Sequence, residues 1–84
     1  MRRVAVAQTV SGARGWIWLD GEDLVFVPVA PGRSGGSTRV FMERARVGAV
    51  PGAVLRLADA WCRRHRLSIV EVDPEFRDGR QTEL

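Results

Sequence analysis

The chain has 84 residues, a formal net charge of +3, and contents of 45% apolar and 27% charged residues. This length allows one modest hydrophobic core, and the composition is that of an ordinary globular protein, which excludes wholesale disorder. All thirteen basic residues are arginine. Without lysine, the chain can form neither a Walker-type phosphate loop nor a Schiff base.

The single cysteine, Cys62, excludes a framework of intramolecular disulfides. The segment 1–9 carries two arginines, but its apolar run is too short for the core of a signal peptide. No apolar run approaches the ~18 residues that would span a membrane. We therefore expect a cytoplasmic protein with no membrane partner.

The charge is polarised along the chain. Residues 43–66 hold six arginines and two acids, a net +4, whereas residues 67–84 hold two arginines and five acids, a net −3. A protein that bound only phosphates would seldom keep so acidic an end. The basic balance of the whole chain is therefore a weak indicator of nucleic-acid binding.

The first predicted strand covers residues 3–10, where valine alternates with small or polar residues, and the Ser, Gly and Arg cluster of 11–15 predicts a turn. Residues 15–30 then predict a β-hairpin, because strong strand formers flank the acidic turn at 20–23. A four-residue loop over that turn keeps all its acids out of the paired strands. The pairs in this register are Leu19 with Leu24, Ile17 with Phe26, and Trp18 with Val25.

After the hairpin, Pro28 should end the third strand because it lacks an amide donor. Residues 31–37 are rich in Gly and Ser and predict a flexible loop. Residues 38–47 fit a strand better than a helix, since their apolar residues scatter around a helical wheel. In a regular strand, Phe41, Ala45 and Val47 would share one side, and Val40 and Met42 the other.

The strongest helix prediction covers residues 51–66, with Pro51 at the first helical position. Its apolar stripe consists of Val54, Leu57, Ala58 and Trp61, widened by Leu55 and Cys62. A last strand follows over 68–72, and residues 75–84 predict a mobile, acidic tail. The chain therefore predicts a single α+β domain over 1–74, of order β-β-β-β-α-β, with one amphipathic helix on one face of a small, mainly antiparallel sheet.

The tryptophans of the hairpin are the main candidate for a binding surface. Trp16 and Trp18 are two residues apart, so both indoles lie on one face of their strand. If the helix covers the face of Ile17 and Phe26, these indoles are left on the opposite face. They would then form a protein-binding surface with Arg33 or Arg39 at its rim, or a platform that stacks bases. The alternative is that this face is itself covered.

A second candidate is the basic face of the helix. Arg56, Arg63, Arg64 and Arg66 could contact phosphates. A run of charges this short is more often a solvated helix face, balanced here by Asp59 and the acidic tail. His65 falls near the centre of the apolar stripe, which favours a packed or capping histidine over a ligand.

Catalytic and metal sites find little support in the sequence. Cys62 and His65 are spaced at i and i+3, but no third group is placed to orient the histidine, and the cysteine lies within the apolar stripe. The alternating acids Glu71, Asp73 and Glu75 could hold a divalent cation only in a continuous strand, and Pro74 interrupts them. We therefore expect no catalytic residues, no metal and no cofactor.

These observations predict a small non-enzymatic interaction module, of the regulator or protein-inhibitor type, that contacts a larger protein or a ribonucleoprotein assembly. The alternative function is nucleic-acid binding through the arginine-rich helix face. The sequence leaves open whether the chain also forms a homodimer.

Overall fold

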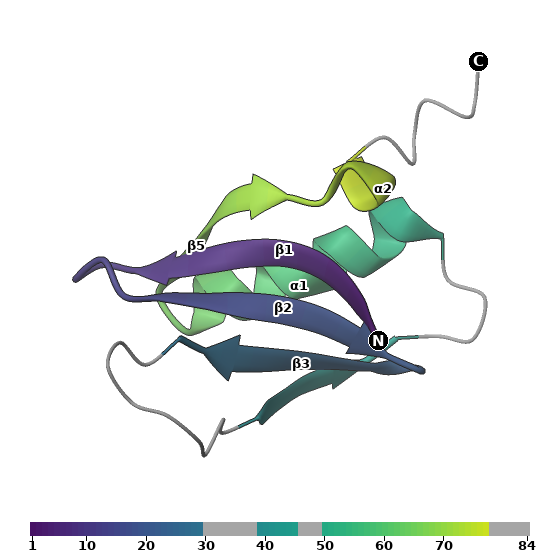
Figure 1. Cartoon of the computed structure of the whole chain (residues 1–84), viewed down its shortest axis with the longest axis horizontal. Coiled ribbons are helices and arrows are strands. Elements are labelled where there is room, and N and C mark those ends of the chain that lie inside the picture. Colours follow the sequence, from purple (N-terminus) through teal and green to yellow (C-terminus); the bar gives the residue numbers. More distant parts are fainter. Residues whose placement is uncertain (30–38, 46–49, 78–84) are drawn as a thin grey trace.

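The computed structural model describes residues 1–29, 39–45 and 50–77. Their elements, in chain order, are β1 (Arg2–Thr9), β2 (Arg14–Asp20), β3 (Asp23–Pro28), β4 (Val40–Arg44), α1 (Pro51–Arg64), β5 (Leu67–Val72) and α2 (Pro74–Arg77). Figure 1 shows the sheet in front and α1 behind it. The predicted α+β fold, with one main helix on one face of an antiparallel sheet, is confirmed.

The strands are arranged in the order β4-β3-β2-β1-β5. The first four follow one another as antiparallel neighbours, and β5 returns beside β1 after the chain has passed through α1. Strands β4 and β5 are therefore the two edges of the sheet (Figure 1).

The β2–β3 hairpin has the predicted register. Its pairs include Leu19 with Leu24, Ile17 with Phe26, and Trp18 with Val25. The turn is tighter than predicted, because Asp20 pairs with Asp23 and leaves only two residues between them. The first of these, Gly21, has a φ of 62°, a left-handed conformation that glycine adopts without a steric penalty.

Helix α1 begins at Pro51 as predicted but ends at Arg64 rather than at residue 66. The amide of His65 donates to the carbonyls of Trp61 and Cys62, and Arg66 then adopts a left-handed φ of 59°, which stops the helical path. The buried residues of the helix are Val54, Ala58, Trp61 and Cys62. These lie within the predicted stripe, with Leu55 and Leu57 packed at its margins.

The core lies between α1 and one face of the sheet. Trp61 packs against Phe26 with ring centroids 6.1 Å apart, and Ile17 and Leu24 are fully buried in the same cluster. Gly15 makes room for this packing, because a Cβ at that position would overlap the ring of Phe26. Of the two faces that the sequence left open, α1 covers the one that carries Ile17 and Phe26.

Strand β4 confirms the strand prediction for residues 40–44, but the prediction that Phe41 and Ala45 share a side is wrong. Phe41 faces away from the core while Met42 and Ala45 are buried in it. The pairing with β3 shifts between Leu24 and Val25, so that Met42 is an extra residue on β4. Such a bulge changes the alternation of side chains, which a regular strand would have preserved. Val47 lies outside the described residues.

The acidic tail predicted from residue 75 is wrong for its first residues. Residues 74–77 form α2, and Phe76 is only 2% exposed in the core. Asp73 begins the turn by accepting hydrogen bonds from the amides of Phe76 and Arg77. The segment is held by the buried Phe76, by these hydrogen bonds, and by the ion pair of Glu75 with Arg2. Residues 78–84, like the predicted loop at 31–37, lie outside the described part of the chain.

Candidate interaction surfaces

The face of the sheet opposite α1 carries a continuous set of apolar side chains. The strand register places Trp16 beside Val6 and Val27, and it places Trp18 beside Val25, which in turn lies opposite Phe41. Side chains of directly paired residues point to the same face of a sheet. We call this set the sheet patch: Val6, Trp16, Trp18, Val25, Val27 and Phe41.

The two indoles of the sheet patch rest on each other and on the valines beneath them. Trp16 and Trp18 meet edge to face, with centroids 6.2 Å apart and planes at 87°. Val6 and Val25 are buried, although they lie outside the core cluster under α1. The indoles therefore cover these valines and are held in place by them.

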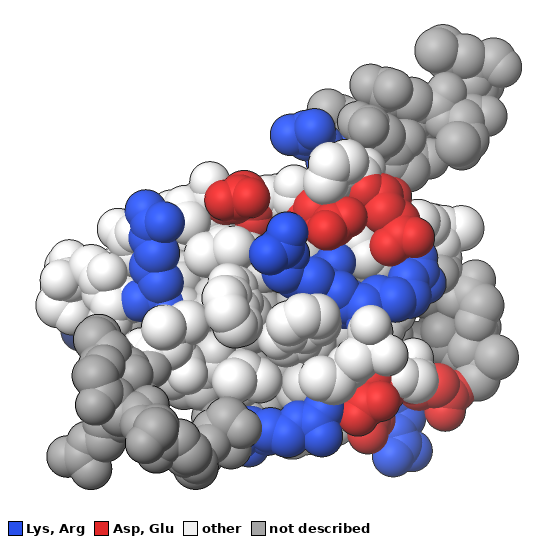
Figure 2. All heavy atoms as spheres, in the orientation of Figure 1, with Lys and Arg blue, Asp and Glu red and all other residues white. Residues whose placement is uncertain are grey.

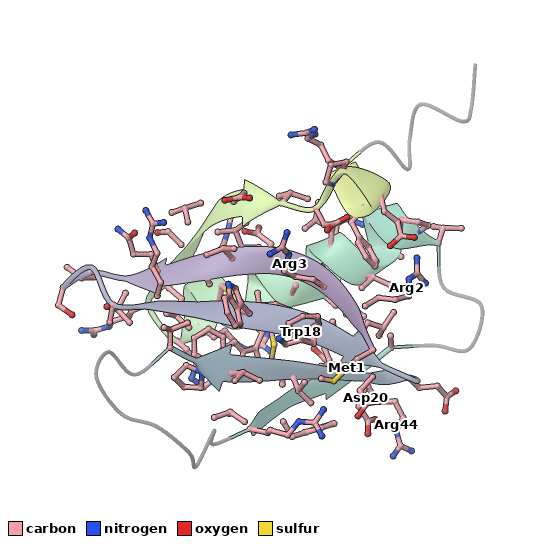
Figure 3. The ribbon with its side chains drawn as sticks, in the orientation of Figure 1. Met1, Arg2, Arg3, Trp18, Asp20 and Arg44 are labelled. Atoms are coloured by element: carbon pink, nitrogen blue, oxygen red, sulfur yellow. The ribbon has the colours of Figure 1, made fainter. Side chains whose placement is uncertain are left out.

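The upper surface of the sheet patch is open to solvent. Trp16 is 40% exposed and Phe41 is 58% exposed, whereas Trp18 is half-buried. Figure 3 shows the Trp18 indole on the side of the sheet that faces the viewer, away from α1. No described residue covers the indole of Trp16 completely, so the structure places both hairpin tryptophans on an accessible face.

Charges of both signs surround the sheet patch. Arg3 lies opposite Trp18 on β1 and is 3.8 Å from the carboxylate of Asp73. Arg39, a predicted rim residue, bonds Asp20 at 2.9 Å. Figure 2 shows uncharged residues across the middle of this face, with arginines and acids together along its borders. Arg33, the other predicted rim residue, lies outside the described residues.

The arginines of the predicted phosphate-binding face do not form one uncompensated cluster. Arg63 pairs with Asp59 at 3.0 Å, and Arg64 approaches Glu43 at 3.8 Å. Arg66 sits beyond the end of the helix in its left-handed conformation. Arg56 faces a different part of the surface, beside β5. Two of the four predicted arginines thus have a carboxylate nearby, Arg63 at bonding distance and Arg64 farther away.

The structure shows a second surface that the sequence did not reveal. Between α1 and the edge strand β5 there is a hollow of about 360 Å³, lined by Leu55, Arg56, Asp59, Ile69 and Val72. A neighbouring hollow of about 360 Å³ shares Leu55 and Arg56, and is otherwise lined by Gly52, Phe76 and Arg77. We call the two together the edge groove. The sequence identifies Leu55, Ile69 and Val72 as apolar residues of a helix and a strand. It cannot show that the fold leaves these side chains partly exposed to solvent.

Cys62 and His65 do not form a reactive pair. Cys62 is fully buried, and burial, with a smaller contribution from the charge of Asp59, raises the pKa of its thiol to about 11. The thiol is therefore protonated at neutral pH and a poor nucleophile. His65 is the C-cap residue of α1, which is one of the two predicted alternatives. Its side chain is exposed, and its ring stacks on Trp61 with centroids 4.1 Å apart.

Two of the three alternating acids near β5, Asp73 and Glu75, have structural partners. Asp73 accepts the amide of Glu75, and Glu75 pairs with Arg2 at 2.8 Å. Within residues 1–29, 39–45 and 50–77, no three His, Cys, Asp or Glu side chains gather as metal ligands. In the same residues no helix has both the length and the apolar character to cross a membrane.

Comparisons with protein-family models, with curated proteins and with solved structures find no significant match for this chain.

Proposed function

We propose that this chain is a small non-enzymatic interaction module, of the regulator or inhibitor type, that binds a larger protein through the sheet patch. The observation that supports this most is the 40% exposure of Trp16 on a face that α1 leaves open. Tryptophan is enriched among the residues that dominate protein interfaces, especially near the centre of the contact. A partner would bury both indoles together with Phe41 and the valines between them.

The geometry favours a protein over a nucleic acid as the occupant of the sheet patch. The edge-to-face packing of Trp16 and Trp18 leaves no pair of parallel ring faces for successive bases. Glu71 pairs with Val6 and therefore lies on the same face of the sheet, where its charge would repel phosphates. A rim of mixed charges around an apolar centre is the usual anatomy of a protein interface.

Nucleic-acid binding through the helix arginines is the second candidate, because Arg56 and Arg66 take no part in the ion pairs that Arg63 and Arg64 make with Asp59 and Glu43. With Arg63 and Arg64 next to carboxylates, few phosphates would be neutralised, and each contact would make binding more salt-dependent. The two proposals are separated by which substitutions abolish binding and by the effect of salt.

The experiment is affinity capture from the native cells with the full chain, using Trp16→Ala, Arg63→Glu/Arg64→Glu and Val50→Ala as variants. Val50 is a matched control because it is an exposed apolar residue outside the sheet patch. We expect one captured protein to be missing with Trp16→Ala and present with the other two variants. Its affinity for Trp16→Ala should be about thirtyfold weaker or more, as for an interface hot spot. Circular dichroism checks that each variant is folded.

Two outcomes would contradict the proposal. The first is a complex that survives Trp16→Ala and Trp18→Ala without loss of affinity. The second is binding to nucleic acid that falls steeply with salt and disappears in Arg63→Glu/Arg64→Glu, which would establish the helix face instead.

A further inference from the structure

The outer edge of β5 is an unpaired edge of the sheet in the described structure. The strand pairs with β1 on one side, and no described strand lies on the other. Residues immediately before and after β5 are described, and neither α1 nor α2 is a strand that could pair with it. An unpaired edge presents backbone donors and acceptors to any extended chain that approaches it.

The edge groove runs beside this strand. Ile69 and Val72 project from β5 toward α1, and Leu55 completes the apolar lining from the helix. A cleft of about 360 Å³ is at the small end of the range for binding sites, and it suits side chains rather than a folded domain. The groove therefore offers an apolar pocket next to a free strand edge.

The charge of the edge groove selects for an acidic ligand. Arg56 is exposed and lines both hollows, and Arg77 lines the second. The acid in the lining, Asp59, is bonded to Arg63 at 3.0 Å, so its charge is partly compensated. A carboxylate that enters the groove would thus meet Arg56, whose guanidinium group favours bidentate contact with carboxylates.

We propose that the edge groove binds an extended, acidic peptide segment of a partner protein, which adds as a further strand to β5. Its backbone would pair with the outer edge, an apolar side chain would enter between Leu55, Ile69 and Val72, and a neighbouring carboxylate would bond Arg56. Strand addition of this kind derives affinity from the backbone and specificity from alternate side chains. The site lies on the opposite side of the sheet from the sheet patch and is independent of it.

A bulge in β5 limits the length of the added strand. Val6 pairs with Glu71 and Ala7 with Ile69, so Val70 is an extra residue. A bulge bends the strand and interrupts regular pairing. The ladder with the peptide is therefore short, and the pocket and Arg56 supply a large part of the affinity.

The test begins with a library of random short peptides displayed on phage and selected on the full chain. Selected peptides are expected to combine an apolar residue with an acid close by. Their affinity is expected to fall about tenfold or more in Arg56→Glu, because a charge-assisted bond is lost and a repulsion is created. Arg66→Glu is the matched control, since it makes the same change of charge outside the edge groove and should leave affinity unchanged.

A second measurement tests the strand geometry directly. N-methylation of alternate peptide amides removes the donors that face β5, whereas methylation of the intervening amides leaves them intact. We expect binding to be lost with only one of the two methylation patterns, and amide resonances of residues 68–72 to shift on binding. Leu55→Ser removes the apolar lining that α1 contributes and leaves Arg56 and the β5 backbone unchanged. This variant should therefore also bind the peptides more weakly.

The proposal is overturned if no peptide is enriched on the chain relative to Leu55→Ser, or if Arg56→Glu and Arg66→Glu behave alike. It is also overturned if the selected peptides lose binding in Trp16→Ala, because they would then occupy the sheet patch. That last result would support the proposed function while rejecting the edge groove. If Trp16→Ala does not affect a native complex, the proposed function is contradicted, and the peptide proposal for the edge groove is not.

Discussion

The indole of Trp61 lies against the ring of Phe26, with centroids 6.1 Å apart and planes inclined by 37°. This contact joins α1 to β3 and thereby decides which face of the sheet is covered. Since neighbouring residues of a strand point to opposite faces, covering Phe26 and Ile17 leaves Trp16 and Trp18 on the other side. Trp61 therefore belongs to the core, whereas Trp16 and Trp18 belong to the sheet patch.

The first prediction compares these roles in stability. Trp61→Ala is expected to lower the free energy of unfolding by about 3–5 kcal/mol, because a buried indole leaves a cavity. Trp16→Ala should cost less, about 2 kcal/mol, since that indole is already 40% exposed. Chemical denaturation measures both. Equal losses for the two variants would mean that the helix does not anchor the fold through Trp61.

The second prediction concerns the close approach of Gly15 and Phe26. A methyl group at Gly15 would overlap the Phe26 ring, so Gly15→Ala should destabilise the fold by about 1–3 kcal/mol. The double variant Gly15→Ala/Phe26→Leu should be more stable than the sum of the two single losses implies, because the smaller side chain relieves the overlap. Gly52→Ala is the matched control: its Cβ has space, and in α1 it should stabilise by about 0.5–1 kcal/mol. Strictly additive losses in the double variant would refute this packing.

The third prediction concerns α2. Phe76→Ala should destabilise the chain by about 3–4 kcal/mol, as expected for a phenylalanine that is 2% exposed. Arg2→Ala should cost about 1 kcal/mol or less, because its ion pair with Glu75 is half exposed, although its guanidinium also lies 5.1 Å from the centre of the Phe76 ring. Thermal unfolding distinguishes the two effects. A Phe76→Ala variant as stable as the parent would restore the mobile tail that the sequence suggested.

The fourth prediction follows from the pKa of Cys62, which burial raises from 9.0 to about 11. The folded state holds this proton more tightly than the unfolded state, so the contribution to stability is complete below about pH 9 and is lost as the pH rises toward about 11. Denaturation curves across this interval should show the loss in the parent chain and a smaller one in Cys62→Ala. A thiol reagent at neutral pH should react only after unfolding. Rapid labelling of the folded chain would show that the thiol is accessible after all.

The sequence predicts much of this fold because its signals are local. The alternation around Trp16 and Trp18 and the acids of the turn determine the hairpin register, and Pro51 with the stripe through Trp61 determines the helix. The same signals leave open which face of the sheet α1 covers, because both faces of the hairpin are apolar. Only the contact of Trp61 with Phe26 in the folded chain decides between them.

The remaining features depend on contacts that are distant in sequence. The bulge at Met42 arises from pairing with β3, and no sequence pattern within residues 38–47 predicts it. Phe76 reads as an isolated apolar residue in an acidic segment until α1 provides its place in the core. The edge groove was missed for the same reason: Leu55 and Ile69 are ordinary stripe residues, and only the assembled fold shows that they are left uncovered beside a free edge.

The most direct test of the central claim is acrylamide quenching of tryptophan fluorescence in two folded variants of the full chain. Trp61→Phe retains only the indoles of the sheet patch, and Trp16→Phe/Trp18→Phe retains only the indole under α1. We predict a quenching constant several times larger for Trp61→Phe, because Trp16 is 40% exposed and Trp61 only 8%. Equal quenching, or stronger quenching of the isolated Trp61, would contradict the open sheet face on which the proposed function depends.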